Sequence, residues 1–321
     1  IPMLAGRGLG HTQGTIDKLE TIPGYRPLLS LHEFQQIVQE VGISIMAQTD
    51  EICPADQKIY ALRDVTDTIA SFPLICGSIM SKKIAEGIQG LVLDIKVGNG
   101  AFIKTISKAK ELGELLQGVG ELYGIYVSTC YTGMDQPLGK TAGLWCEIME
   151  SITCLKGNGP DDVMTVVYHL GEEALKLAGI QNPEKQLRTA ISDGSALEIF
   201  RKMVTAHGGS LKSLDNPEIH KALFRQEVRA ETDGYICYMD TLRLGMGVVH
   251  FGGGRLQQGD VLDPTVGIIL HKKIGDLVHV GEPLMEFFCS DKDKFESGKL
   301  YIKEAIQIQS EPPEPITLIY R

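Results

Sequence analysis

The chain has no excess of positive charge and no long hydrophobic run. Its 321 residues carry a formal net charge of −10, which argues against nucleic acid as a partner, although a local cluster of donors can still hold a small anion. No apolar run approaches the length of a membrane span, so we expect no membrane-bound part. The seven cysteines form no CxxC pair, which indicates neither a zinc site nor a disulfide framework and favours a reducing, cytoplasmic setting.

Low-complexity tracts and long internal repeats are also absent from the sequence. Its glycines follow neither the Walker A pattern nor the dinucleotide-binding fingerprint. The composition, with 43% apolar and 22% charged residues, is typical of a globular protein with one large or two modest domains. The function must therefore be inferred from particular segments.

Strand-like and helix-like segments alternate over the first half of the chain. Residues 91–97 form a nearly continuous apolar run, as expected for a strand buried on both faces, and residues 98–102 form a glycine-containing turn after it. Ligands of open α/β sheets bind at such carboxyl ends of strands. A helix over residues 107–122 and a strand over 124–129 follow. We therefore predict an α/β fold with a mixed central sheet flanked by helices.

The pattern changes near residue 225. Residues 155–224 are mostly helical in pattern, whereas short β-like runs begin after residue 230 and residues 266–287 are rich in hairpin signals. We predict an α/β domain over residues 1–224 and a carboxyl-terminal α+β hairpin subdomain over residues 225–321.

One predicted helix carries a stripe of mixed character. Ile75, Ser78, Ile79 and Lys82 recur at three- and four-residue spacing, so they share one face. This stripe makes a poor core face, because a buried lysine needs a partner. It suits the floor of a site for a flat, partly apolar ligand with carbonyl oxygens, and the planar donors of Arg63 suit one such oxygen. The alternative is an ordinary amphipathic helix whose lysine extends into water.

A glycine-rich loop over residues 6–15 precedes another short helical pattern. Glycines let backbone amides approach an anion closely, so Thr15 and the amides near it are candidates for a phosphate contact. The alternative is a tight turn with a structural role only. We interpret His11 in this loop as a structural hydrogen-bonding residue rather than a general base.

Several motifs together resemble the thymidine phosphorylase and pyrimidine-nucleoside phosphorylase family. They lie in order along essentially the whole chain, at residues 6–20 (GRGLGHTQGTIDKLE), 60–65 (YALRDV), 77–83 (GSIMSKK), 93–102 (LDIKVGNGAF), 134–139 (MDQPLG) and 271–276 (HKKIGD). The resemblance implies phosphorolysis, in which inorganic phosphate displaces the base of a pyrimidine nucleoside and yields the free base and a sugar 1-phosphate. The motifs are most similar to those of the thymidine-cleaving members, which implies thymine and 2-deoxyribose 1-phosphate as products.

The resemblance also implies roles for particular side chains. A catalytic trio binds the base: Arg63, Ser78 and Lys82. Apolar walls line the base pocket: Tyr60, Ile75, Ile79 and Phe102. Thr15 contacts phosphate. A potassium ion is expected at Leu138, Thr141 and Glu150, for which the alternative is that Glu150 is a surface helix carboxylate. The expected partners are a pyrimidine nucleoside and inorganic phosphate, with no organic cofactor.

The chain departs from the family pattern on the phosphate side. The family's main phosphate loop, Lys-His-Ser-Thr-Gly-Gly, precedes the point where this sequence starts, and its small helical domain is represented by residues 49–85 alone. Ala5 stands where the family usually has serine, and Gln13 where it has glycine. We therefore expect an impaired phosphorylase. Members of the family form homodimers through the helical domain, so we expect a monomer or an ill-defined oligomer here.

Three other interpretations stay open. A phosphoribosyltransferase-like activity also uses a glycine-rich anion loop, and a non-catalytic binding protein could keep this fold. The carboxyl-terminal hairpins resemble half of a lipoyl- or biotinyl-carrier module, which would need Lys292 on an exposed tight turn between two matching hairpins.

Overall fold

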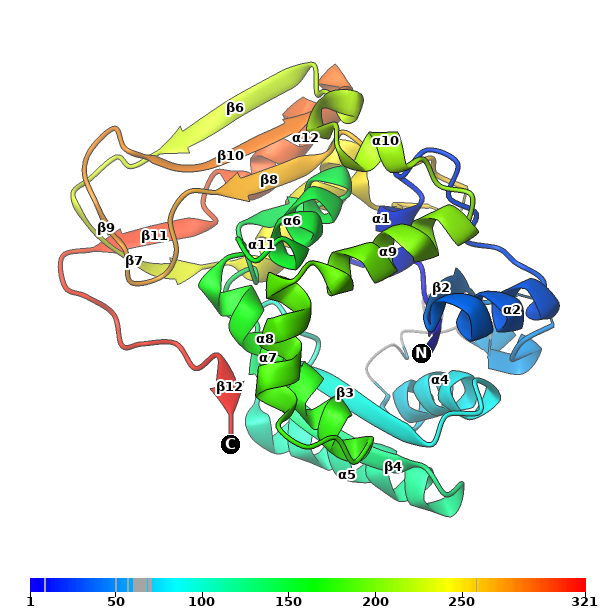
Figure 1. The fold of residues 1–321 in the computed structure, drawn as a ribbon. Coiled ribbons are helices and arrows are strands. Elements are labelled where there is room, and N and C mark those ends of the chain that lie inside the picture. Colours follow the sequence, from blue (N-terminus) through cyan, green and yellow to red (C-terminus); the bar gives the residue numbers. More distant parts are fainter. Residues whose placement is uncertain (9, 50, 57, 60–67, 69–70, 258) are drawn as a thin grey trace.

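Helices and strands follow one another along the whole chain, which confirms the predicted α/β fold (Figure 1). The structure is a computed structural model that describes residues 1–8, 10–49, 51–56, 58–59, 68, 71–257 and 259–321. The predicted ligand-binding residues Tyr60 and Arg63 lie outside these described residues. Within them, no helix is both long enough and apolar enough to cross a membrane.

The first part of the chain forms a two-stranded parallel sheet from β1 (Pro2–Ala5) and β2 (Ser44–Ala47). Two helices connect these strands, α1 (Thr15–Leu19) and α2 (Leu31–Val41). Helix α2 begins with a capping box, in which the Ser30 hydroxyl accepts from the Glu33 amide at 3.2 Å and the Glu33 carboxylate accepts from the Ser30 amide at 2.9 Å. This local sequence signal explains where the helix starts.

A second sheet contains parallel strands β3 (Gly90–Val97) and β4 (Tyr126–Gly133), with β12 (Ile319–Tyr320) antiparallel to β4. Helix α5 (Ile106–Leu122) connects β3 to β4, and α4 (Phe72–Ala85) packs beside α5. One face of β3 joins a buried apolar cluster through Leu91, Ile95 and Val97.

The other face of β3 is only half-buried, so the prediction of a strand buried on both faces is wrong. On this face the Lys96 ammonium pairs with Asp94 at 2.7 Å and donates to the Thr132 hydroxyl at 2.7 Å. A polar face of this kind replaces the second apolar layer that a continuous hydrophobic run usually indicates.

The predicted helical region over residues 155–224 is confirmed. Strand β5 (Thr141–Gly143) and helix α6 (Trp145–Leu155) precede it. The region itself contains α7 (Asp161–Leu177), α8 (Pro183–Ser192), α9 (Ser195–Ala206), α10 (Leu211–Leu214) and the 3-10 helix η1 (Pro217–His220). Helix α7 packs against β3 and β4, and α6 packs against α9 and η1.

The remaining chain forms two antiparallel sheets, in the orders β5-β8-β10-β6 and β11-β7-β9. Their elements are β6 (Phe224–Arg229), β7 (Gly234–Met239), α11 (Thr241–Val248), the π-helical segment η2 (Val249–Gly253), β8 (Gly267–Leu270), β9 (Leu277–Val278), β10 (Pro283–Cys289), α12 (Lys292–Ile302) and β11 (Ile306–Gln309). Because β5 pairs with β8, one sheet includes residues from both predicted domains, and the boundary near residue 225 stays a prediction.

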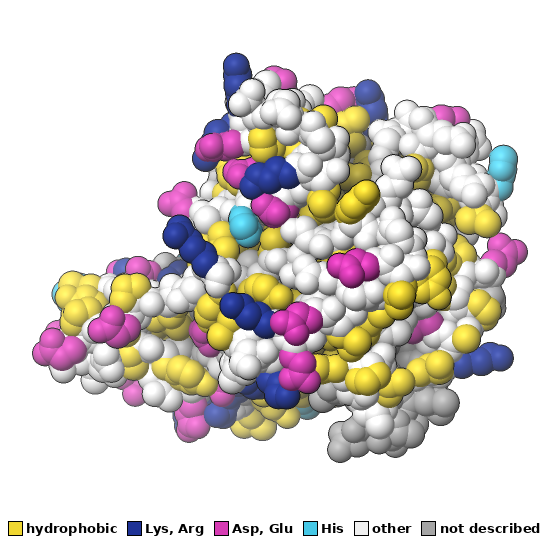
Figure 2. All heavy atoms as spheres, turned by 90° about the horizontal axis from the view of Figure 1, so that it is seen from below, with side chains coloured by type: hydrophobic (Ala, Val, Ile, Leu, Met, Phe, Trp, Pro, Cys, Tyr) yellow, Lys and Arg dark blue, Asp and Glu magenta, His cyan; other side chains and the backbone are white. Residues whose placement is uncertain are grey.

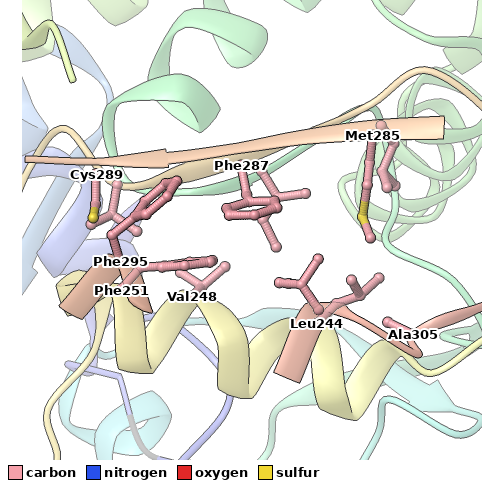
Figure 3. Packing of buried hydrophobic residues seen from close by; sticks show 12 residues of the cluster. Leu244, Val248, Phe251, Met285, Phe287, Cys289, Phe295 and Ala305 are labelled. Carbon is pink, nitrogen blue, oxygen red and sulfur yellow. The ribbon is translucent and has the colours of Figure 1, made fainter. Parts of the chain in front are cut away.

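Aromatic packing forms the core of this carboxyl-terminal part. Figure 3 shows Phe251, Phe287 and Phe295 facing one another between helix α11 and strand β10. The rings of Phe251 and Phe287 are stacked with centroids 5.1 Å apart. Gly298 lies so close to Phe251 that a Cβ there would be 2.2 Å from the ring. Such close packing makes this part a rigid support for the segments that project from it.

Lys292 is the first residue of helix α12 and does not lie on a turn between two matching hairpins. The Asp291 carboxylate caps this helix by accepting from the amides of Asp293 and Lys294 at 2.9 and 3.0 Å. The carrier interpretation is therefore wrong, because its modified lysine would need an exposed hairpin turn.

Charged side chains of both signs are scattered over one face of the molecule. On the face that Figure 2 shows, Lys and Arg side chains lie among Asp, Glu and hydrophobic side chains, and no broad basic area is visible. The absence of nucleic acid among the partners stays a prediction from the negative net charge.

His207 is fully buried between strand β2 and helix α9. Its Nδ1–H donates to the Arg26 carbonyl at 2.9 Å, its Nε2 accepts from the Ser44 hydroxyl at 2.8 Å, and its ring stacks on Tyr25. Burial lowers the pKa of His207. Just below pH 6.5, this imidazole is therefore neutral in the folded chain and protonated in the unfolded chain.

We expect acid to destabilise the protein through His207. Because its folded pKa is lowered, the stability it contributes is complete above the unfolded pKa of about 6.5 and is lost as the pH falls below that value, with a slope of up to about 1.4 kcal/mol per pH unit. Urea unfolding at pH 7.5 and 5.5 measures this loss. His207→Gln should reduce it, whereas His279→Gln, at an exposed position, should not. Equal pH dependence in both variants would contradict the assignment.

Candidate functional site

Helix α4 brings Ser78 and Lys82 together, as their spacing predicted. The Lys82 ammonium donates to the Ser78 hydroxyl at 3.1 Å and also to the Ser78 carbonyl. It forms an ion pair with Asp56 at 2.7 Å, and the two side chains are only 16% and 8% exposed. The alternative that Lys82 extends into water is therefore wrong. Asp56 is the partner that a buried ammonium requires, and sequence reasoning missed it because 26 residues separate the pair.

Ile75 and Ile79 are half-buried on the same helix and pack against the apolar cluster that α4 shares with β3 and α5. Each side chain thus holds the helix against this cluster and stays partly exposed. Their role as pocket walls stays a prediction, and so do the wall role of Tyr60 and the base-binding role of Arg63.

Helix α4 is tied directly to the strand that leads into the glycine-rich loop. The Leu4 amide of β1 donates to the Glu86 carboxylate at 2.8 Å, and Lys83 pairs with the same carboxylate at 2.7 Å. The Cys53 thiol also lies 3.2 Å from the Ser81 carbonyl of α4. Helix α4, which carries the candidate base-binding side chains Ser78 and Lys82, is therefore bonded to β1, the strand before the glycine-rich loop.

The glycine-rich loop crosses itself at Gly8 and Gly14. A Cβ on Gly14 would lie 2.3 Å from the Gly8 nitrogen, and a Cβ on Gly8 would lie 2.8 Å from the Thr12 carbonyl oxygen. Both positions therefore require glycine, for close backbone packing rather than for a special backbone angle. Thr15 follows this crossing at once as the first residue of α1, where it is exposed.

His11 joins the glycine-rich loop to the turn after β3. It is buried, and its Nε2–H donates to the Gly100 carbonyl at 2.6 Å. Its ring also contacts Phe102, with centroids 5.2 Å apart, while Phe102 itself is 50% exposed. The structure thus confirms that His11 has a structural hydrogen-bonding role, and it places the predicted wall residue Phe102 beside the predicted phosphate loop.

Asn99 fixes the same turn to more distant parts of the chain. Its side-chain amide donates to the carbonyls of Asp135 and Met239 at 3.0 and 2.9 Å, and its side-chain oxygen accepts from the Thr241 amide at 2.9 Å. Sequence reasoning missed this role, since nothing local to residue 99 indicates partners in two distant segments, at residue 135 and at residues 239–241.

The predicted potassium residues Thr141 and Glu150 lie together. The Glu150 carboxylate accepts from the Lys140 amide at 2.8 Å and from the Thr141 hydroxyl at 3.1 Å, and burial raises its pKa. Both side chains line a cavity of about 1130 Å³ between α6, α7 and the sheet that contains β8. The alternative of a surface carboxylate is wrong for Glu150. Its oxygens, with the Thr141 hydroxyl, are donor types that suit an alkali cation.

The described contacts divide the predicted residues into three groups. Ser78 and Lys82 lie on α4, Thr15 and Phe102 lie at the glycine-rich loop and the turn bound to it, and Thr141 and Glu150 line the cavity. The cavity is large, but the residues that line it do not include those of the first two groups. Size alone therefore does not mark it as the reaction site.

Comparisons with known proteins identify the family of this chain. A family model described as glycosyl transferase family, a/b domain, matches residues 1–197, and one described as pyrimidine nucleoside phosphorylase C-terminal domain matches residues 235–309. These two matches define the chain as a glycosyl transferase of the α/β class.

Two curated relatives extend the match to the full chain. The pyrimidine-nucleoside phosphorylase of Staphylococcus haemolyticus (strain JCSC1435) is 38% identical over 326 residues, which is 100% of this chain and 75% of the relative. The pyrimidine-nucleoside phosphorylase of Geobacillus stearothermophilus is also 38% identical, over 325 residues with the same coverage. The chain belongs to the pyrimidine-nucleoside phosphorylase family.

Proposed function

We propose that this chain catalyses the phosphorolysis of pyrimidine nucleosides. A phosphate oxygen forms a bond to C1′ of the sugar while the bond from C1′ to the base nitrogen breaks, and the electron pair of that bond leaves with the base. Family membership and the names of the two relatives support the reaction class. The observation that carries the proposal is the pairing of the Lys82 ammonium and the Ser78 hydroxyl on one face of α4.

The chemistry of the departing base explains why an ammonium is needed there. Negative charge moves onto the base carbonyl oxygens as the bond breaks, so a cationic donor stabilises the transition state more than the bound nucleoside. Asp56 holds the Lys82 ammonium in place before substrate arrives. The Ser78 hydroxyl is a second donor for the base, and Arg63, as the resemblance implies, is a third.

Thymidine is the nucleoside that we propose as the preferred substrate, with thymine and 2-deoxyribose 1-phosphate as products. We also propose a weak affinity for phosphate. Ala5 supplies no hydroxyl at the end of β1, and Gln13 replaces a residue that the resemblance expects to be glycine.

The test is phosphate-dependent release of base, followed by ultraviolet absorbance with thymidine, 2′-deoxyuridine and uridine in parallel. The proposal predicts release that requires phosphate, is fastest with thymidine and shows a high KM for phosphate. Release without phosphate would indicate hydrolysis instead. Thymine binding by calorimetry without release from any nucleoside would support the non-catalytic interpretation.

We propose further that potassium binds at Glu150 and Thr141, with the Leu138 carbonyl as a third oxygen. A cation bound there would stabilise the segment from residue 138 to 141 and helix α6 against each other. We expect KCl to raise the melting temperature above that in NaCl of equal ionic strength, because a bound ion stabilises the folded state alone. Glu150→Gln should abolish the difference, and Glu184→Gln, on the exposed surface of α8, should keep it. Equal melting temperatures in both salts for the unaltered protein would contradict the site.

A further inference from the structure

Asp17 is a buried carboxylate behind the glycine-rich loop. It lies in helix α1, and its side chain is only 2% exposed. One carboxylate oxygen accepts from the Gly8 amide at 2.6 Å. The other accepts from the guanidinium groups of Arg255 at 2.9 Å and Arg7 at 3.3 Å. Both oxygens are therefore engaged, by three donors from two parts of the chain, the glycine-rich loop and the segment after η2.

The bond to Gly8 holds the point where the loop crosses itself. Gly8 is the residue on which Gly14 packs, and Thr15 follows Gly14 directly. A shift of the Gly8 amide would therefore shift Gly14 and, with it, the hydroxyl of Thr15. Arg255 follows η2 in the carboxyl-terminal part, 238 residues from Asp17, so the same carboxylate attaches the loop to that rigid part.

A carboxylate directly behind an anion-binding loop repels the anion. Arg7 and Arg255 offset this repulsion, although Arg7 also pairs with Glu20. The four side chains together carry no net charge, so the network adds no attraction for phosphate. Burial opposes ionisation of Asp17, but the bonds from Arg255 and the Gly8 amide outweigh it and keep the pKa of this carboxyl below its ordinary value. The network therefore holds the loop in place and does not attract phosphate.

We propose that Asp17 is a positioning residue for the phosphate side of the site, acting through the Gly8 amide on Gly14 and Thr15. This inference rests on the proposed phosphorolysis. Asp17 does not contact phosphate in this role. Arg255 takes part as the group that holds the carboxylate from the carboxyl-terminal side.

Positioning and simple electrostatics predict opposite results for Asp17→Asn. If Asp17 acted only as a negative charge near an anion, its removal would lower the KM for phosphate. If it positions the loop, the KM for phosphate should rise about tenfold or more, because small displacements of binding groups are costly. An asparagine keeps one acceptor oxygen and presents an NH₂ group to a donor, so either the Gly8 bond or the arginine bonds must break. The KM for nucleoside should change little.

Glu20→Gln is the matched control. It removes the same unit of charge from the same network but leaves the bond between Asp17 and Gly8 in place. Its KM for phosphate should stay the same or fall. Equal changes in the KM for phosphate in the two variants would overturn the proposal, and so would an Asp17→Asn variant that raises the KM for nucleoside as much as that for phosphate.

Two further measurements test the proposal when the Asp17→Asn variant or the activity assay gives no result. If Asp17→Asn does not fold, Arg255→Lys keeps the charge but loses the guanidinium that donates to Asp17, and its KM for phosphate should rise in the same direction. If the unaltered protein releases no base, the proposed function fails, and the rise of melting temperature with inorganic phosphate becomes the readout. A rise that Glu20→Gln keeps and Asp17→Asn loses would support the positioning role, whereas no rise in the unaltered protein would overturn it as well.

Discussion

Replacing Lys82 with alanine is expected to lower kcat for phosphorolysis by about 100- to 1000-fold, the usual cost of losing one donor to a developing negative charge. The ammonium is well placed for this role, because it is nearly buried and already bonded to the Ser78 hydroxyl. Rates of base release at saturating nucleoside and phosphate measure the effect. Lys108→Ala is the control, since Lys108 is exposed on the neighbouring helix α5 in an ion pair of little energetic weight.

A second variant separates chemistry from stability. Lys82→Ala leaves the Asp56 carboxylate buried without its cation, which destabilises the fold. In the double variant Lys82→Met, Asp56→Asn both charges are removed together, so the melting temperature should recover while kcat stays low. If the double variant regained activity along with stability, Lys82 would be a structural residue and the proposed transition-state role would be wrong.

Replacing Gly14 with alanine should weaken the binding of phosphate strongly and should lower the stability of the protein. The added methyl group would lie 2.3 Å from the Gly8 nitrogen and 2.5 Å from the Arg7 carbonyl carbon. Backbone atoms cannot rotate away as a side chain can, so the crossing must open and Thr15 must move. Overpacking of this kind costs about 1–3 kcal/mol, and we expect the KM for phosphate to rise at least about tenfold. Phosphate titrations and thermal unfolding give the two values.

Gly6→Ala is the control within the same loop. A Cβ on Gly6 meets no atom within 4 Å, and its backbone is not in the left-handed region that favours glycine. Its kinetics and melting temperature should match those of the unaltered protein. Similar losses in both variants would mean that the loop tolerates no substitution at all, and the specific contact between Gly8 and Gly14 would explain nothing.

The sequence by itself determined the features that depend on near neighbours in the chain. Four-residue spacing placed Ser78 and Lys82 on one helix face, because 3.6 residues complete each turn. The alternation of strand and helix patterns predicted the α/β fold, and the glycines of residues 6–15 predicted a tight turn as one of two interpretations of that loop. His11 was assigned correctly to a structural role, although its partner Gly100 lies 89 residues away.

The sequence pattern gave a wrong prediction for the burial of one strand face, because that burial depends on the element packed against it. Residues 91–97 look like a strand buried on both faces, yet one face is half-buried and holds the ion pair between Asp94 and Lys96. An apolar run reports side-chain hydrophobicity and says nothing of which element covers each face. Helix α7 covers this one, and it starts 64 residues after β3 ends.

Only the tertiary structure decided the partners of the charged and polar groups. Asp56 neutralises Lys82, Arg255 holds Asp17, and Asn99 reaches two distant segments. Each of these contacts depends on the path of the chain between the two residues, and that path is set by the burial of many apolar side chains at once. Hydrogen bonds and ion pairs form only within about 3 to 4 Å, so their partners become known when the packing has brought distant segments to that distance.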